Sequence, residues 1–145
     1  METVEEVTLQ RRYLSLVDET EEDQADTLKF SFSSEKPVSR YAFDEVLDHS
    51  EESVDMTRLN ASAPLLFNHN PDKPIGVVQR AWLSDRKGYA RIKWGTSQLA
   101  EEVRKDVENG ILKSISVGYR INETDTEEKY GIVRATSWTP YELSV

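Results

Sequence analysis

Short stretches in which apolar and polar residues alternate run through most of the chain. Because neighbouring side chains of a strand point to opposite faces, this pattern predicts β-strands that are each buried on one side. The clearest example lies at 27–33, where Leu28, Phe30 and Phe32 are separated by polar residues. Turn-forming residues delimit the other predicted strands, which cover 7–17, 64–68, 75–83, 88–94, 111–121, 131–138 and 141–145.

One segment repeats its apolar residues at helical spacing instead. Leu99, Val103 and Val107 recur every four residues, which predicts a helix with one narrow buried stripe. Ser97, or the threonine before it, would cap the first turn through its hydroxyl. Gly110 stands where a left-handed residue would end the helix. The sequence therefore predicts one well-formed helix late in the chain.

Three polar segments connect these elements. Residues 84–87 form a four-residue loop, so the strands on either side of it are expected to pair as a hairpin. Residues 122–129 are predicted to form a polar turn. Residues 44–60 contain no long apolar face, and we expect an irregular excursion with one short helix there.

Many short strands with one clear helix predict an α+β, β-rich fold. We expect a closed or partly open antiparallel β-barrel flanked by helices. A chain of 145 residues fits one globular domain, with an N-terminal strand and acidic loop at 1–26 and the main domain at 27–145. The alternation at 141–145 runs on without a terminating turn, which suggests a domain cut from a longer polypeptide.

Composition and charge exclude several classes of protein. The 27 acidic and 18 basic residues give a formal charge of −9, which disfavours binding to a phosphate backbone. No cysteine is present, so disulfides and thiolate metal sites are excluded, and no apolar run approaches a membrane span. The acidic run at 18–26 has Asp23 where a calcium loop needs glycine, so a solvated loop is expected. We predict no nucleic-acid or membrane partner.

Few residues in the chain could serve as a base for a nucleophile. Such a site needs a hydroxyl, a base within hydrogen-bonding reach and a group that orients the base. Of the two histidines, His49 lies among acidic residues in a polar segment, which predicts an exposed side chain without a catalytic role. His69 follows the apolar residues 65–67, so its backbone is anchored while its ring can reach a rim. A histidine at a strand end is nevertheless more often structural than catalytic.

The predicted strand at 111–121 places Ser114, Ser116 and Gly118 opposite its apolar row. The ordinary interpretation is a solvent-facing side, and the alternative is a serine placed there to react. Glycine within a strand often marks a close backbone approach. Glu142 also lies opposite the apolar row of its strand, so two strands could present a serine and an acid on one surface. None of these features is specific alone.

Taken in order, several motifs resemble the prohead (head maturation) proteases of tailed phages, which are similar in fold and mechanism to herpesvirus assemblins. The motifs are LLFNHN at 65–70, PIGVV at 74–78, GIL at 110–112 followed by SISVGY at 114–119, and YELSV at 141–145. The resemblance covers about residues 30–145. It implies a serine endopeptidase that trims scaffold and capsid-protein termini, and itself, inside the assembling prohead in the host cytoplasm.

The resemblance also implies a role for each site residue. Ser116 would be the nucleophile, His69 the general base and Glu142 the third member that orients the histidine. Ser114 points to the same face two residues earlier and could be mistaken for the nucleophile, but it does not match the motif serine. The partners implied are scaffold and major capsid proteins, with a homodimer suggested by the assemblins. Neither a cofactor nor a metal is called for.

Two alternatives stay open at this stage. Glu123 or Asp125 could orient the histidine instead of Glu142, since assemblins use a second histidine in that position. Assemblin-like enzymes also take their oxyanion-hole backbone from a loop after the third position, whereas only residues 143–145 follow Glu142 here. A catalytically silent protease-fold module that acts in scaffold or capsid assembly is therefore the second hypothesis. A general esterase is disfavoured because no Gly-x-Ser-x-Gly motif exists.

Overall fold

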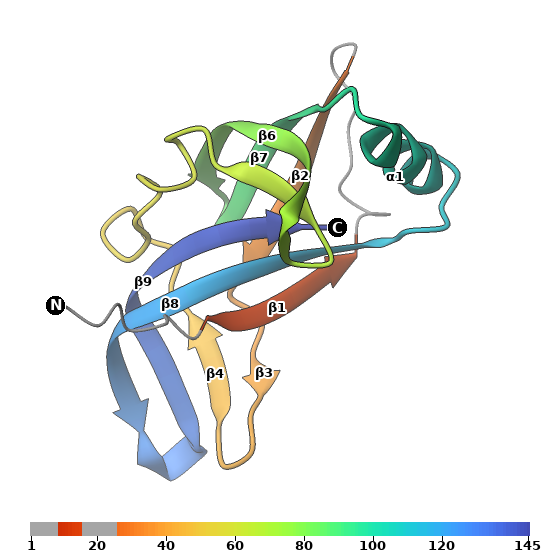
Figure 1. Ribbon diagram of the computed structural model, residues 1–145. Helices are drawn as coiled ribbons and strands as arrows, with labels where there is room; N and C mark the ends of the chain where they lie inside the picture. The colour runs from red at the N-terminus through yellow and green to blue at the C-terminus, as the bar shows by residue number, and fades with distance from the viewer. Residues whose placement is uncertain (1–8, 16–25) are drawn as a thin grey trace, which may run out of the picture.

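The computed structural model of the chain describes residues 9–15 and 26–145 (Figure 1). One α-helix, α1 (Gln98–Glu108), and a 3-10 turn, η1 (Glu128–Tyr130), accompany the strands in this part of the chain. The strands are β1 (Gln10–Ser15), β2 (Thr27–Ser34), β3 (Val38–Ser39), β4 (Asp44–Leu47), β5 (Pro64–Phe67), β6 (Asn70–Ser84), β7 (Lys87–Trp94), β8 (Ser114–Glu127) and β9 (Ile132–Ser144).

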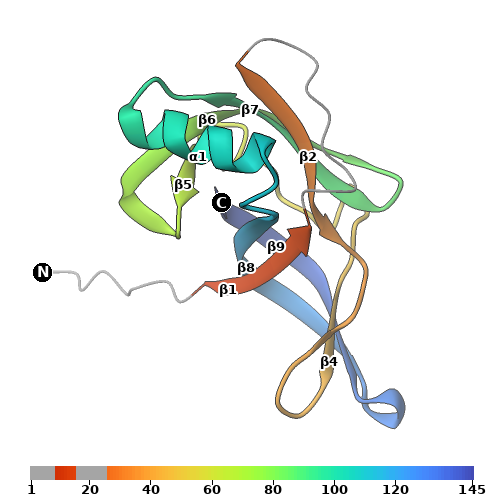
Figure 2. The ribbon, with the colours of Figure 1, turned by 90° about the vertical axis from the view of Figure 1, so that its right-hand side faces the viewer.

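The strands form one curled sheet in the order β1-β8-β9-β5-β6-β7-β2, with β4 branching from β9 and β3 from β4. Pairing is mixed, because β4 and β5 each lie parallel to β9. Across residues 9–15 and 26–145 no ladder joins β1 to β2, the two ends of this order, and a single helix packs against β6 and β7 (Figure 2). The β-rich, partly open form is confirmed. A closed, wholly antiparallel barrel flanked by several helices is not what these residues form.

Several predicted boundaries shift because backbone pairing extends into polar sequence. β8 and β9 pair as a long arm through the predicted turn at 122–129, and the two predicted strands at 131–138 and 141–145 are one strand. The β6–β7 loop has two residues, Asp85 and Arg86, rather than four. Both have positive φ, at 49° and 57°, which suits a tight hairpin turn. Within the predicted strand 7–17, residues 10–15 form β1, and the acidic run at 18–25 lies outside the described residues.

The excursion after β4 forms turns, and the helix expected within 44–60 is not present. The few apolar side chains of the excursion anchor it to the sheet. Leu59 is fully buried, and Val54 bridges to Trp138 of β9. Because the excursion returns the chain to the same end of the sheet, β4 and β5 both enter parallel to β9.

The helix α1 forms where its spacing predicted it. The hydroxyl of Ser97 accepts a hydrogen bond from the backbone of Ala100 at 3.1 Å. Val103 is buried against β6 and β7 together with Ala100, while Leu99 is only partly buried. Gly110 adopts φ 71°, the left-handed conformation expected of a residue that ends a helix.

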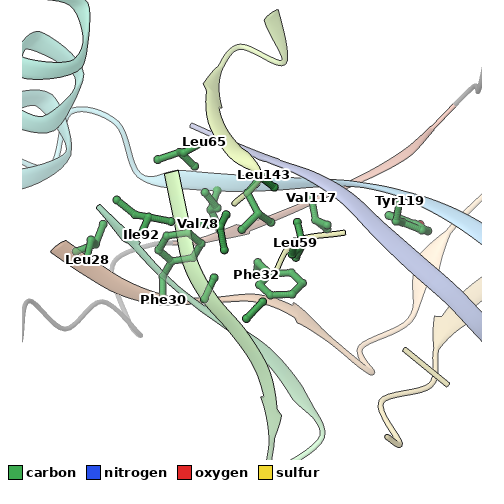
Figure 3. Close-up of a cluster of buried hydrophobic side chains, with 14 of the residues drawn as sticks. Leu28, Phe30, Phe32, Leu59, Leu65, Val78, Ile92, Val117, Tyr119 and Leu143 are labelled. Atoms are coloured by element: carbon green, nitrogen blue, oxygen red, sulfur yellow. The ribbon is translucent and has the colours of Figure 1, made fainter. Parts of the chain in front are cut away.

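The hydrophobic core lies on the concave face of the curled sheet (Figure 3). Side chains from β2, β5, β6, β7, β8 and β9 meet there with Leu59 of the excursion. Trp94 and Trp138 are buried, and Trp82 stacks on Tyr89. Tyr130, by contrast, is exposed at the tip of the β8–β9 arm.

The edge strand β1 is held by one buried polar cluster. The Arg12 guanidinium donates to the backbone oxygen of Glu45 at 2.7 Å and forms an ion pair with its carboxylate at 3.2 Å. The Tyr119 hydroxyl also donates to the Glu45 carboxylate, and burial raises the pKa of Tyr119. β1 pairs along β8 with Tyr13 opposite Ser116. The serine is therefore flanked by strands on both sides.

Candidate active site

The register of β8 and β9 brings polar residues together on the outer face of the sheet. Ser116 pairs with Ser144 and Gly118 pairs with Glu142. Between them, Val117 of β8 faces the core and is fully buried. Because paired residues of neighbouring strands point to the same side, these four polar or small residues share one surface.

A tight turn delivers His69 to the same surface. Phe67 and Asn70 pair across the β5–β6 hairpin, so Asn68 and His69 form its two-residue loop. Their φ angles are 52° and 53°, and positive φ at both positions defines the turn that suits the twist of a hairpin. β5 also pairs with β9, with Leu66 opposite Ser144, so the turn lies directly beside the outer face.

The imidazole of His69 lies between a serine and a carboxylate. Its Nε2 is 2.7 Å from the Ser116 Oγ and its Nδ1 is 2.8 Å from the Glu142 Oε1. A carboxylate can only accept a hydrogen bond, so Nδ1 carries the proton and Nε2 of the neutral ring accepts from the serine hydroxyl. The side chain of His69 is 5% exposed, Ser116 is 5% exposed and the side chain of Glu142 is 21% exposed. The serine and the imidazole are thus largely covered, and the carboxylate is the most exposed member of the group.

Two neighbours fix this arrangement. The Ser144 hydroxyl accepts the backbone N–H of His69 at 2.8 Å and lies 3.1 Å from the carbonyl of Leu66, to which it can donate. Gly118 leaves room for the acid, since a Cβ there would lie 2.8 Å from the Glu142 Cγ. The expected close approach at this glycine is therefore made by a side chain rather than by backbone. The motif gave no indication of a role for Ser144 beyond its alternation in the strand.

Residues 5–145 match the family model of the caudovirus prohead serine proteases. The chain belongs to this family. The major capsid protein of Halomonas phage phiHAP-1 is 40% identical in an alignment 122 residues long that covers 79% of this chain and 20% of that protein. The family member described here thus spans about a fifth of the length of that relative.

The fold has a counterpart among solved structures. The capsid assembly protease gp21 of bacteriophage T4 superposes with a TM-score of 0.56 at 13% sequence identity. The match covers 94% of this chain and 99% of that chain. At this level of identity the likeness establishes a shared protease-like fold.

None of the other candidates from the sequence, all of them described residues, forms a hydrogen bond with the His69 ring. Ser114 is exposed at the start of β8, opposite Ser15. Glu123 and Asp125 are exposed on the β8–β9 arm, seven and nine residues beyond Ser116. At about 3.3 Å per residue they are roughly 23 Å or more from Ser116 along the strand. Of the three acids considered, only Glu142 contacts the His69 ring.

The predicted exposure of His49 is wrong, because the residue is buried and only 4% exposed. Its Nδ1 donates to the Leu47 carbonyl at 2.8 Å and its Nε2 lies 2.8 Å from the Ser33 Oγ. The ring packs edge-on against Trp138, and burial lowers the pKa of His49. Nothing in the local sequence indicates the long-range contacts that enclose it.

The described part of the chain contains no cluster of three or more histidines or acids able to hold a metal ion. None of its helices has the length and apolar character needed to cross a membrane.

Proposed function

We propose that this chain is a serine endopeptidase that cleaves scaffold and capsid-protein termini, and itself, inside the assembling phage prohead. The observation that carries the proposal is the hydrogen-bonded series Ser116, His69 and Glu142, with distances of 2.7 and 2.8 Å at the two ring nitrogens. Membership of the prohead serine protease family supports both the reaction and the place where it occurs.

The geometry supports acyl transfer in two stages. The Ser116 Oγ forms a bond to a peptide carbonyl carbon while its proton moves to the His69 Nε2, and Glu142 stabilises the imidazolium that results. The carbon–nitrogen bond then breaks as His69 returns the proton to the leaving amine. Water attacks the acyl-enzyme with His69 again taking the proton, which releases the acid and restores Ser116.

A second function is favoured by one observation. The relative from phage phiHAP-1 is named a major capsid protein, which fits an assembly module that uses the protease fold without its chemistry. The aligned serine, histidine and acid argue for the first function.

A fluorophosphonate probe, which reacts with activated serines, separates the two functions. We expect it to label the chain at Ser116 and to leave Ser116→Ala unlabelled. Self-cleavage of a full-length polypeptide containing the chain should disappear with the same variant, because losing the nucleophile costs about 10⁶ in kcat in a serine protease.

Two matched serine variants serve as controls in this experiment. Ser114→Ala removes the exposed alternative serine of β8, and Ser33→Ala removes the hydroxyl beside His49. Both variants should still be labelled by the probe. Loss of labelling in Ser114→Ala would mean that the wrong nucleophile is assigned. A folded wild-type chain that neither reacts nor cleaves itself would favour the assembly module.

A further inference from the structure

A pocket of about 550 Å³ lies beside the candidate active site, on the outer face of the sheet. Its lining includes Arg120, which follows Ser116 and Gly118 on the outer face of β8. Tyr141, which also lines it, immediately precedes Glu142 in β9. Pro64 borders the pocket at the start of β5, the strand that leads into the His69 turn. The pocket and the site are thus connected by three strands.

The separation between the two suits an extended peptide. Ser116 and Arg120 are four residues apart on one strand, which corresponds to about 13 Å. A peptide in extended conformation rises by the same amount per residue. A substrate lying along β8 with its scissile bond at Ser116 would therefore place a side chain about four residues away at the pocket.

Two cations define the chemistry of this pocket. The guanidinium carbon of Arg58 lies 4.4 Å from the centre of the Tyr141 ring and that of Arg120 lies 5.5 Å from it. Each uses its Nε for a neutral partner, the Tyr141 carbonyl at 3.0 Å for Arg58 and the Asn122 side chain at 3.1 Å for Arg120. Both arginines are exposed.

These cations are not neutralised by neighbouring acids. Among residues 9–15 and 26–145, no ion pair involves Arg58 or Arg120. Asp55 also lines the pocket as a carboxylate, and hydrogen bonds from the Thr57 side chain and from the Thr57 backbone N–H, the latter at 3.0 Å, lower the pKa of Asp55 and favour its charged form. With two arginines against this one carboxylate, the pocket lining carries a net positive charge on a chain whose formal charge is −9.

We propose that Arg58, Arg120 and Tyr141 form an acidic-residue subsite. It binds a glutamate or aspartate of the peptide substrate about four residues from the scissile bond. The carboxylate is held by the free ends of the guanidiniums, and the aliphatic stem packs on the tyrosine ring. This inference rests on the proposed function, because it assigns a substrate class to that same site.

Peptide binding to the Ser116→Ala chain tests the subsite without turnover. Dye-labelled peptides tiled along the phage scaffold and capsid proteins are measured by fluorescence anisotropy, each beside copies with one acid replaced by its amide. We expect one Glu→Gln or Asp→Asn change, about four residues from the cut, to weaken binding about three- to tenfold at low salt. High salt should reduce this difference.

Arginine variants in the same background show which residues discriminate. Arg58→Met with Arg120→Met should bind the acidic and amide peptides equally. Arg80→Met is the matched control, because the Arg80 guanidinium lies 5.2 Å from the Trp82 ring, outside the pocket lining. It should keep the full discrimination.

The outcomes separate this inference from the proposed function. Equal affinity for acidic and amide peptides, no measurable binding of any acidic peptide, or unchanged discrimination in the double arginine variant would each overturn the subsite. If the wild-type chain is labelled at Ser116 by the fluorophosphonate in those cases, the protease assignment stands. If the chain discriminates between acidic and amide peptides but is not labelled by the fluorophosphonate, the acidic-peptide subsite stands and the protease assignment is wrong.

Discussion

His49 and His69 each hold a serine hydroxyl at hydrogen-bonding distance, 2.8 Å to Ser33 and 2.7 Å to Ser116. The first pair is enclosed, since Ser33 is fully buried and the His49 ring packs against Trp138. The second pair is also largely buried, but it lies beside a partly exposed carboxylate. A short distance from serine to histidine therefore does not distinguish a catalytic pair from a structural one.

The difference lies at the opposite ring nitrogen. The Nδ1 of His49 donates to the neutral Leu47 carbonyl, whereas the Nδ1 of His69 donates to the Glu142 carboxylate. Either partner fixes the tautomer of a neutral ring. Only the carboxylate offers a negative charge that stabilises the imidazolium formed when the ring takes a proton. The pair at His69 can thus work as a base, while the pair at His49 favours the neutral ring.

Replacing each histidine in turn should give the largest contrast. We expect His69→Ala to lower the cleavage rate by about 10⁶ because the general base is lost. His49→Ala should keep the rate but lose about 2–4 kcal/mol of unfolding free energy, since it leaves a cavity beside Trp138 and an unpaired buried hydroxyl. Phosphonate labelling and urea denaturation measure the two effects. Loss of labelling in folded His49→Ala would contradict the distinction.

Each histidine has a carboxylate beside it, Glu142 at His69 and Glu35 at His49. We expect replacement of the first to lower the cleavage rate and replacement of the second to leave it unchanged. Glu142→Gln keeps the shape but removes the charge that orients His69, and we expect the rate to fall by about 10⁴. Glu35→Gln is the matched control, because the Glu35 carboxylate accepts only the backbone N–H of His49 among the contacts of that histidine. Steady-state cleavage of one peptide checks both variants. A rate within tenfold of wild type in Glu142→Gln would remove Glu142 from the site.

A smaller loss of cleavage rate is expected from a change at Gly118, which leaves room for the Glu142 side chain. Gly118→Ala places a methyl group 2.8 Å from the Glu142 Cγ, so the Glu142 side chain must shift. A misplacement of about 1 Å can cost about 10² in rate, and we expect a loss of that order with little change in the midpoint of thermal unfolding. Full activity in Gly118→Ala would show that the acid keeps its position without the glycine.

The smallest effect concerns pH and the enclosed histidine. Because burial lowers the pKa of His49, the folded chain binds this proton more weakly than the unfolded chain. Its contribution to stability is present above the unfolded pKa of about 6.5 and is lost as the pH falls towards the lowered folded pKa. One such group changes the unfolding free energy by at most about 1.4 kcal/mol per pH unit.

Comparison with His49→Gln isolates this contribution from the carboxylates that titrate at lower pH. The unfolding free energy of the wild-type chain should fall more steeply between pH 7 and pH 5 than that of the variant. Urea denaturation at several pH values measures both slopes. Equal slopes would mean that His49 does not contribute to the acid sensitivity of the fold.

The local pattern of apolar and polar residues was sufficient to predict much of the secondary structure. Alternation placed Ser116 and Gly118 opposite the buried Ile115 and Val117, and helical spacing located α1 with its Ser97 cap. These features depend on residues close in sequence. The ordered motifs then selected three residues that the fold brings into contact, although each had an ordinary structural explanation by itself.

Features that depend on distant contacts could not be predicted. The parallel pairing of β4 and β5 with β9 depends on how the excursion between them returns. The turn at Asn68 and His69 lacks the glycine that usually marks such a hairpin. His49 has acidic neighbours in sequence, yet β2 and β9 cover it with Ser33 and Trp138. In each case tertiary packing overrides the local composition.

The parallel pairing of β5 with β9 has a consequence for timing. His69 is separated from Ser116 by 47 positions and from Glu142 by 73, and β9 lies between β5 and β8 in the sheet. Contacts between such distant segments form slowly, because chain entropy must be lost before they are gained. A partly folded chain without β9 in place holds neither the acid nor the Ser144 support for the turn. The group formed by Ser116, His69 and Glu142 is therefore complete only once β9 has joined the sheet between β5 and β8.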